Sequence, residues 1–124
     1  MSLGAFSISL NVKDLGASRA FYHTLGFADF GGGMDKGYVV LKNGATLVGL
    51  YQGFIPANTL TFNPGWDQDA APVAGDWEDV RAIQARLQAA GLTLETTCDP
   101  EGTGPAYIVL TDPDGNPVLI DQHR

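Results

Sequence analysis

The chain has 124 residues, of which 44% are hydrophobic and 17% are charged, a balance that is typical of a globular domain and excludes an intrinsically disordered chain. Acidic residues outnumber basic residues by 14 to 7, which gives a formal net charge of −7. This charge argues against a protein that binds nucleic acid or an anionic membrane through a basic patch.

The cysteine content and the lengths of the apolar runs exclude further classes of protein. Cys98 is the one cysteine, which excludes an intramolecular disulfide and a multi-cysteine zinc site. No apolar run approaches the ~20 residues that cross a bilayer. The N-terminus has no basic residue ahead of its apolar stretch, as a signal peptide would have. We therefore expect a cytoplasmic protein with neither a membrane nor a nucleic acid as partner.

The first half of the chain predicts a strand, a helix and three further strands. Residues Phe6–Val12 alternate between apolar and polar side chains, which indicates a half-buried strand. Asp14 is placed to cap a helix that Gly26 ends. The apolar stripe of this helix comprises Ala17, Phe21 and Leu25, widened by Leu15 and Tyr22. The remaining strands are expected at Phe27–Phe30, Tyr38–Leu41 and Thr46–Gln52, with Gly31–Gly33 as a loop.

The second half repeats this order after a longer loop. Residues Thr59–Asn63 alternate again, and their polar face resembles that of the first strand. Asp76 is expected to cap a helix, with Asp79 as a weaker partner and Gly91 at its end. Its apolar stripe comprises Trp77, Val80, Ile83, Leu87 and Ala90. Strands are expected at Leu92–Thr96, Ala106–Thr111 and Pro117–Asp121, the last two joined by a tight turn at Asp112–Asn116.

These elements predict an α+β protein built from two βαβββ modules within a single domain, 1–124. The first module covers about 5–53 and the second about 58–123. One module alone cannot cover both faces of its sheet, so two modules, or two chains, are expected to form a curved mixed sheet around a cleft. The helices would cover the apolar faces, and the polar strand faces would line the cleft.

The same motifs resemble the vicinal oxygen chelate superfamily, which includes glyoxalase I, bleomycin-resistance proteins and extradiol dioxygenases. The resemblance is carried by Leu10–Leu15, Ser18–Tyr22, Leu25–Phe27, Ile83–Gly91 and Asp112–Pro117, which cover essentially the whole chain in the family's order. It implies the glyoxalase/bleomycin-resistance/dioxygenase fold, a cleft for a small organic molecule, and a homodimer.

Metal-using members of this superfamily hold a metal in the cleft with His and Glu side chains. The resemblance places the corresponding positions at Ser7, which lies five residues before Val12, and at Gly49, Thr59 and Leu119. Divalent metals in such sites prefer imidazole or carboxylate ligands. Hydroxyl groups are poor substitutes, and glycine and leucine side chains offer no ligand. We therefore expect no usual metal site and no cofactor.

A displaced site is the alternative. Asp121 lies two residues beyond Leu119 and should share its face, and His123 follows two residues later. The pair could supply two metal ligands, or Asp121 could be a general base with a pKa raised by an apolar cleft. A solvated chain end is the competing interpretation. Trp66, beside Asn63, could stack on a planar ligand or could cap the core under the long loop.

The sequence thus predicts a ligand-binding face that includes strand residues from both modules. Its members are Ser7, Ser9, Asn11, Thr59, Thr61, Asn63, Trp66, Tyr107, Leu119 and Asp121, with Asp121 as the one candidate for catalysis. The favoured function is binding or sequestration of a small organic molecule. The alternatives are a metal-dependent lyase, isomerase or dioxygenase with displaced ligands, and a filled cleft that serves assembly alone.

Overall fold

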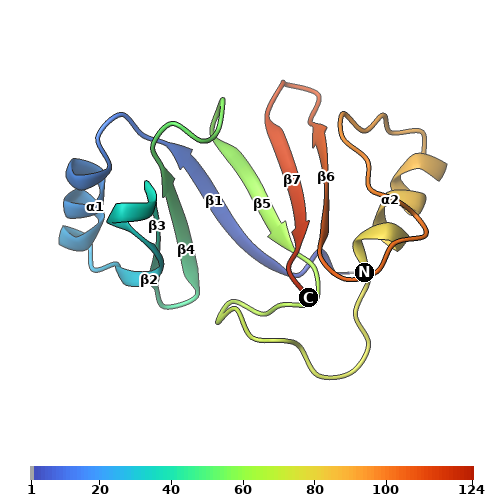
Figure 1. Ribbon diagram of the computed structural model, residues 1–124, viewed down its shortest axis with the longest axis horizontal. Coiled ribbons are helices and arrows are strands. Elements are labelled where there is room, and N and C mark those ends of the chain that lie inside the picture. Colours follow the sequence, from blue (N-terminus) through green and yellow to red (C-terminus); the bar gives the residue numbers. More distant parts are fainter. Residues whose placement is uncertain (1) are drawn as a thin grey trace. The chain divides into compact units, whose positions relative to one another are not determined.

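The computed structural model describes residues 2–124, which fold into helices and strands as the α+β prediction requires (Figure 1). The elements are β1 (Ala5–Asn11), α1 (Leu15–Thr24), β2 (Ala28–Gly33), a 3₁₀ turn η1 (Met34–Lys36), β3 (Tyr38–Asn43), β4 (Thr46–Tyr51), β5 (Thr59–Asn63), α2 (Val80–Ala89), β6 (Ala106–Thr111) and β7 (Pro117–Gln122). The chain divides into a first unit, Ser7–Thr59, and a second unit, Leu60–Arg124 together with the residues up to Phe6. Neither α1 nor α2 is long and apolar enough to cross a membrane.

The first unit is a sheet in the order β2-β3-β4-β1 with α1 against one face (Figure 1). Strands β1 and β4 are parallel, and β3 is antiparallel to both of its neighbours. The core between helix and sheet consists of Leu15, Val39, Leu41, Val48 and Leu50. Alternation along β1 places Ile8 and Leu10 against this core, so the serines of β1 face the other way.

Helix α1 begins and ends where the sequence predicts, but it turns a different side to the core. The Asp14 carboxylate accepts a hydrogen bond from the backbone N–H of Ala17 at 3.0 Å, and Gly26 takes a positive φ of 103° after the last turn. The stripe of Ala17, Phe21 and Leu25 is exposed, and Phe21 and Leu25 keep 60% and 57% of their surface. Leu15 and Tyr22 make the core contacts instead, so the predicted main stripe was wrong.

Strand β2 differs from the expectation as well. The predicted loop Gly31–Gly33 is part of the strand, and its residues pair with Val40, Val39 and Tyr38 of β3. Backbone pairing needs no side chain, so three glycines can extend a strand when a neighbour supplies the hydrogen bonds. The register shifts between Asp29 and Gly31, which is where the strand bulges.

The second unit repeats the arrangement on a smaller scale. Its strands lie in the order β5-β7-β6, with β5 parallel to β7 and β6 antiparallel to β7. Helix α2 packs Val80 and Ile83 against Ile108 and Ile120. A first strand parallel to the last strand, with a helix on one face, is common to both units. The internal duplication predicted from the sequence is therefore present in the topology.

Two elements of the second unit differ from the prediction. Helix α2 begins at Val80 because the cap is Asp79, whose carboxylate accepts the N–H of Arg81 at 2.8 Å. Asp76 and Trp77 precede the helix. The expected strand Leu92–Thr96 is reduced to one bridge between Thr96 and Val109. The Gln84 side chain bonds both the N–H and the C=O of Cys98, so a helix residue takes the backbone groups that a longer strand would pair.

The turn between β6 and β7 forms as predicted. Asp112 N–H donates to the carbonyl of Asn116 at 2.9 Å, and Gly115 adopts a φ of 92°. The Asp112 carboxylate also accepts the N–H groups of Asp114 and Asn116. A hydrogen bond from the Asn116 side chain, joined by these backbone N–H groups, lowers the pKa of Asp112. The turn fixes the pairing of Thr111 with Pro117, and hence the position of every side chain along β7.

Candidate functional site

The first polar face lies on the side of the first unit's sheet that is opposite α1. The pairs Ser9–Gly49 and Asn11–Tyr51 join β1 to β4, and Tyr38 of β3 pairs with Tyr51. Paired residues in a sheet point to the same side, so these five residues share one face. Ser7 belongs to it by alternation. Ser9 is buried with 5% of its surface exposed, whereas Asn11 is exposed.

Tyr51 occupies the space that a side chain at position 49 would need. A Cβ on Gly49 would lie 2.7 Å from Cε1 of Tyr51 and 3.2 Å from its hydroxyl oxygen. Real Cβ atoms essentially never show separations under about 3.0 Å, so a side chain at position 49 would require the Tyr51 ring to move. The Tyr51 ring stacks on Tyr38 with 5.4 Å between centroids and an interplanar angle of 5°. The first polar face thus carries aromatic surface where a metal ligand was sought.

A third ring, Phe54, completes this cluster, which sequence reasoning missed. Phe54 meets Tyr38 edge to face at 6.2 Å and keeps 60% of its surface exposed. A Cβ on Gly37 would lie 2.9 Å from the Phe54 ring, so this glycine makes room for an aromatic neighbour, as Gly49 does. The pairing of Tyr38 with Tyr51 could have been predicted from the sequence, because the short turn between Asn43 and Thr46 fixes the register of the two strands.

The second polar face lies on the side of the second unit's sheet that is opposite α2. Thr61 pairs with Leu119, and Tyr107 pairs with Asp121. Asn63 shares the face by alternation, and its side-chain N–H donates to the backbone carbonyl of Asp121 at 2.9 Å. The Tyr107 side chain, which the sequence places in the predicted ligand-binding face, lies on this face with 53% of its surface exposed. Alternation along β5 gives Thr59 the same side, and its hydroxyl donates to the carbonyl of Ala57 at 2.9 Å.

Beyond the end of β7, the imidazole of His123 links Asp121 to Trp66. His123 Nε2 lies 3.3 Å from a carboxylate oxygen of Asp121. The hydrogen bond that the His123 imidazole donates to the Asp121 carboxylate, aided by the charge of that carboxylate, outweighs partial burial and raises the pKa of His123. The same ring stacks on the Trp66 indole with centroids 4.8 Å apart. Trp66 is therefore partly covered by His123, and the amide of the neighbouring Asn63 is engaged with β7.

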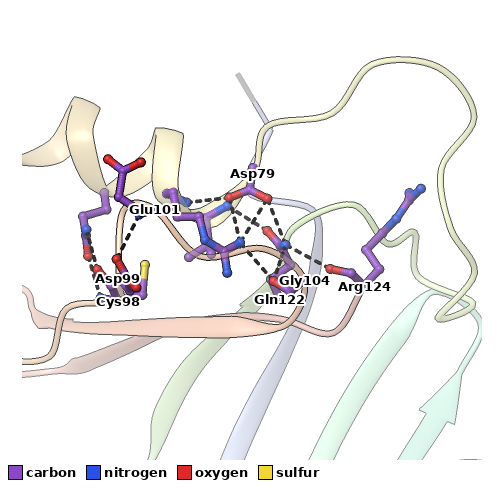
Figure 2. Close-up of polar contacts among 10 residues, drawn as sticks. Asp79, Cys98, Asp99, Glu101, Gly104, Gln122 and Arg124 are labelled. Atoms are coloured by element: carbon purple, nitrogen blue, oxygen red, sulfur yellow. Dashed lines mark hydrogen bonds and ion pairs between the residues drawn. The ribbon is translucent and has the colours of Figure 1, made fainter.

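A buried polar network holds the start of α2 against the end of β7 (Figure 2). The central residue of this network is Gln122, of which 1% of the surface is exposed. Its side-chain oxygen accepts the N–H of Val80 at 2.7 Å. Its side-chain nitrogen donates to the Asp79 carboxylate at 3.0 Å and to the carbonyl of Gly104 at 3.1 Å. Burial alone would raise the pKa of Asp79, but hydrogen bonds from the backbone of Arg81, from Gln122 and from the Arg81 guanidinium lower it. This network fixes the chain end that carries Asp121 and His123.

The donors on these faces do not fit a divalent metal. Ser7, Gly49, Thr59 and Leu119 supply two hydroxyl groups, of which the Thr59 hydroxyl donates to the backbone, and no carboxylate or imidazole. Asp121 and His123 are close enough to act together, but residues 2–124 contain no cluster of three or more His, Cys, Asp or Glu side chains. A metal needs three or four such ligands, so the donor set disagrees with the metal chemistry that the resemblance implies.

The sequence and the fold were compared with those of known proteins and protein families. Residues 4–120 match the family described as the Glyoxalase/Bleomycin resistance protein/Dioxygenase superfamily. No curated protein matches the chain. Among solved structures, a superfamily member from Vibrio splendidus 12B01 has 17% identity and a TM-score of 0.62, with 94% of this chain and 97% of that chain covered. A structure described as an NAD-dependent benzaldehyde dehydrogenase from Legionella pneumophila has 15% identity and a TM-score of 0.69, with 96% and 99% covered.

The solved structures support the fold, and the family match extends over nearly the whole sequence. The motifs that the sequence carries, the duplicated units and this match agree with one another. The chain belongs to the Glyoxalase/Bleomycin resistance protein/Dioxygenase superfamily.

Proposed function

We propose that this protein binds a small, planar organic molecule on its polar strand faces, without a divalent metal. The observation that carries the proposal is the position of the Tyr51 ring over Gly49. The resemblance implies a metal ligand at this position in members that use a metal, and here the space holds a phenol that is stacked on Tyr38. Ligand sites are commonly apolar or aromatic surfaces with a few polar groups that orient the bound molecule.

The groups around the two faces suit such a ligand. The rings of Tyr38, Tyr51 and Phe54 offer apolar contact area on the first polar face. On the second polar face, the half-exposed phenol of Tyr107 lies opposite the carboxylate of Asp121. A phenol can donate or accept a hydrogen bond, and a carboxylate accepts one. A flat aromatic molecule suits the rings of the first polar face, and a molecule with a polar edge suits the phenol and carboxylate of the second polar face. We keep Ser7, Ser9, Asn11, Thr61 and Leu119 as contacts on the same faces.

A metal-dependent lyase, isomerase or dioxygenase activity is the second candidate, favoured by the 3.3 Å approach of His123 to Asp121. Residues 2–124 place no third His, Cys, Asp or Glu side chain beside this pair. A metal bound there would need at least one further ligand from another molecule. The test is metal analysis of the purified protein. Stoichiometric nickel, zinc, manganese or iron that is lost in Asp121→Ala would favour this candidate over metal-free binding.

The proposal itself is tested by ligand-observed NMR on a set of planar aromatic compounds, with metal removed by a chelator. Compounds that bind wild type should bind Tyr51→Leu at least several-fold more weakly, because the stacked surface is lost. The matched control is Tyr22→Leu, which removes a ring of α1 that packs into the core on the opposite face of the same sheet. Equal binding by wild type and Tyr51→Leu would contradict the proposal.

We also propose that the protein is a homodimer, as the resemblance implies. The exposed apolar side chains of the first unit, Phe21, Leu25, Phe30 and Met34, are available to such an interface. The cleft and the cytoplasmic location expected from the sequence stay predictions.

A further inference from the structure

A pocket in the second unit, which we call the loop pocket, lies beside the long segment between β5 and α2. Its volume is about 980 Å³, within the usual range for small-molecule sites. Both tryptophans of the protein, Trp66 and Trp77, line it. Every charged residue in the lining is acidic, namely Asp67, Asp76, Glu78 and Asp79. Of the residues that line this pocket, Trp66 is the one that also belongs to the predicted ligand-binding face.

The walls of the loop pocket are held in place by the end of the chain. The Arg124 guanidinium donates to the carbonyl of Gly65 at 2.9 Å and lies 4.6 Å from the ring centroid of Trp77. Gly65 has a φ of 83°, and a Cβ there would lie 2.6 Å from Arg124 and 2.8 Å from Trp77. Three residues after Gly65, the Gln68 side chain donates to the carbonyl of Phe6 at 2.9 Å. The segment is thus held near β5 by Gly65 and Gln68, and near α2 by the contact of Trp77 with Arg124.

The four carboxylates are not equally compensated. Glu78 forms an ion pair with Arg86 at 3.0 Å, and Asp79 forms one with Arg81 at 3.2 Å. Within residues 2–124, the Asp67 carboxylate accepts the backbone N–H groups of Asp69 and Ala71, at 2.9 and 3.1 Å, and forms no ion pair. Asp76 is exposed and makes no hydrogen bond or ion pair within residues 2–124. The lining therefore carries negative charge in excess beside two indole rings.

We propose that the loop pocket binds an organic cation with an apolar body, such as a quaternary ammonium compound. Indole faces attract cations, and the Arg124 guanidinium over Trp77 shows that one face of this ring already holds a cation. Asp76 and Asp67 select the charge, and the indoles together with Val73 and Ala74 contact the apolar body. An anion of the same shape is rejected by the same carboxylates.

The test uses the two indole N–H signals in NMR spectra of ¹⁵N-labelled protein, because both tryptophans line the pocket. Phenyltrimethylammonium should shift both signals saturably, and benzenesulfonate should not. Asp76→Asn should weaken binding of the cation about two- to five-fold, and Trp77→Phe should also weaken it. The matched control is Asp114→Asn, which removes the same charge from the exposed turn between β6 and β7.

Equal shifts with both probes, or no shift with the cation, would overturn the proposal. Equal weakening by Asp76→Asn and Asp114→Asn would overturn it as well, because the attraction would then be a property of net charge. Tyr51→Leu should leave these shifts unchanged. A failure here is thus distinguishable from a failure of binding on the polar strand faces.

Discussion

Replacing Gly49 by alanine tests the position of the Tyr51 ring directly. The added Cβ would lie 2.7 Å from Cε1 of Tyr51, so the ring must move or the strand must yield. Overpacking typically costs about 1 to 3 kcal/mol, and loss of the stack with Tyr38 would cost about 0.5 to 1.5 kcal/mol. Alanine in a strand gains about 0.5 to 1 kcal/mol over glycine. We expect Gly49→Ala to lower the free energy of unfolding by roughly 0.5 to 2 kcal/mol.

The assay is a double-mutant cycle by urea unfolding, followed by circular dichroism. In the Tyr51→Ala background the obstructing ring is absent, so Gly49→Ala should be neutral or should stabilise by about 0.5 kcal/mol. The two mutations should therefore couple by about 1 to 2 kcal/mol. The control is Gly16→Ala, where an added Cβ would lie at an ordinary 3.6 Å from the Asp14 carboxylate, and its effect should not depend on Tyr51. An equal cost of Gly49→Ala in both backgrounds would refute the reasoning.

Two further predictions concern the second unit. Gln122→Met should lower the free energy of unfolding, measured by urea denaturation, by about 2 to 5 kcal/mol, because the Val80 N–H and the Asp79 carboxylate lose their buried partner. A loss under about 1 kcal/mol would contradict a stabilising role for this network. His123 has a raised pKa, so its pairing with Asp121 stabilises fully below the unfolded pKa near 6.5 and is lost as pH rises through the folded pKa. NMR titration should show that Asp121→Asn lowers the His123 pKa, and an unchanged pKa would refute the pairing.

Much of the fold follows from short-range patterns. Alternation along Phe6–Val12 and Thr59–Asn63 predicts two strands with polar faces. Both are present, the first as β1, which begins and ends one residue earlier, and the second as β5 with the predicted bounds. The turn at Asp112–Asn116 fixes β6 and β7 because Asp112 holds the turn with local hydrogen bonds alone. Polar residues of these strands share faces as predicted, since side-chain alternation in a strand needs no knowledge of distant residues.

The errors come from contacts between residues far apart in sequence. Asp76 and Asp79 are both competent helix caps, and the choice of Asp79 is supported by Gln122 at the other end of the chain. Gly31–Gly33 joins β2 because β3 supplies the partners. Helix α1 buries Leu15 and leaves Phe21 exposed, which periodicity alone does not decide.

The candidate site was predictable in part. The polar strand positions and Tyr107 were identified, but the aromatic cluster of Tyr38, Tyr51 and Phe54 was not. The lack of a side chain at Gly49 was apparent from the sequence. The ring of Tyr51, two residues later, fills the space beside Gly49, and this position depends on side-chain packing that the sequence alone does not reveal.

The central claim is that binding on the polar strand faces needs no divalent metal. The most direct measurement is the dissociation constant of an aromatic compound that binds wild type, determined before and after exhaustive treatment with a chelator and again after addition of nickel, zinc, manganese or iron. The account predicts one dissociation constant under all these conditions, and a several-fold weaker one for Tyr51→Leu. Loss of binding with the chelator, restored by one stoichiometric metal, would contradict it.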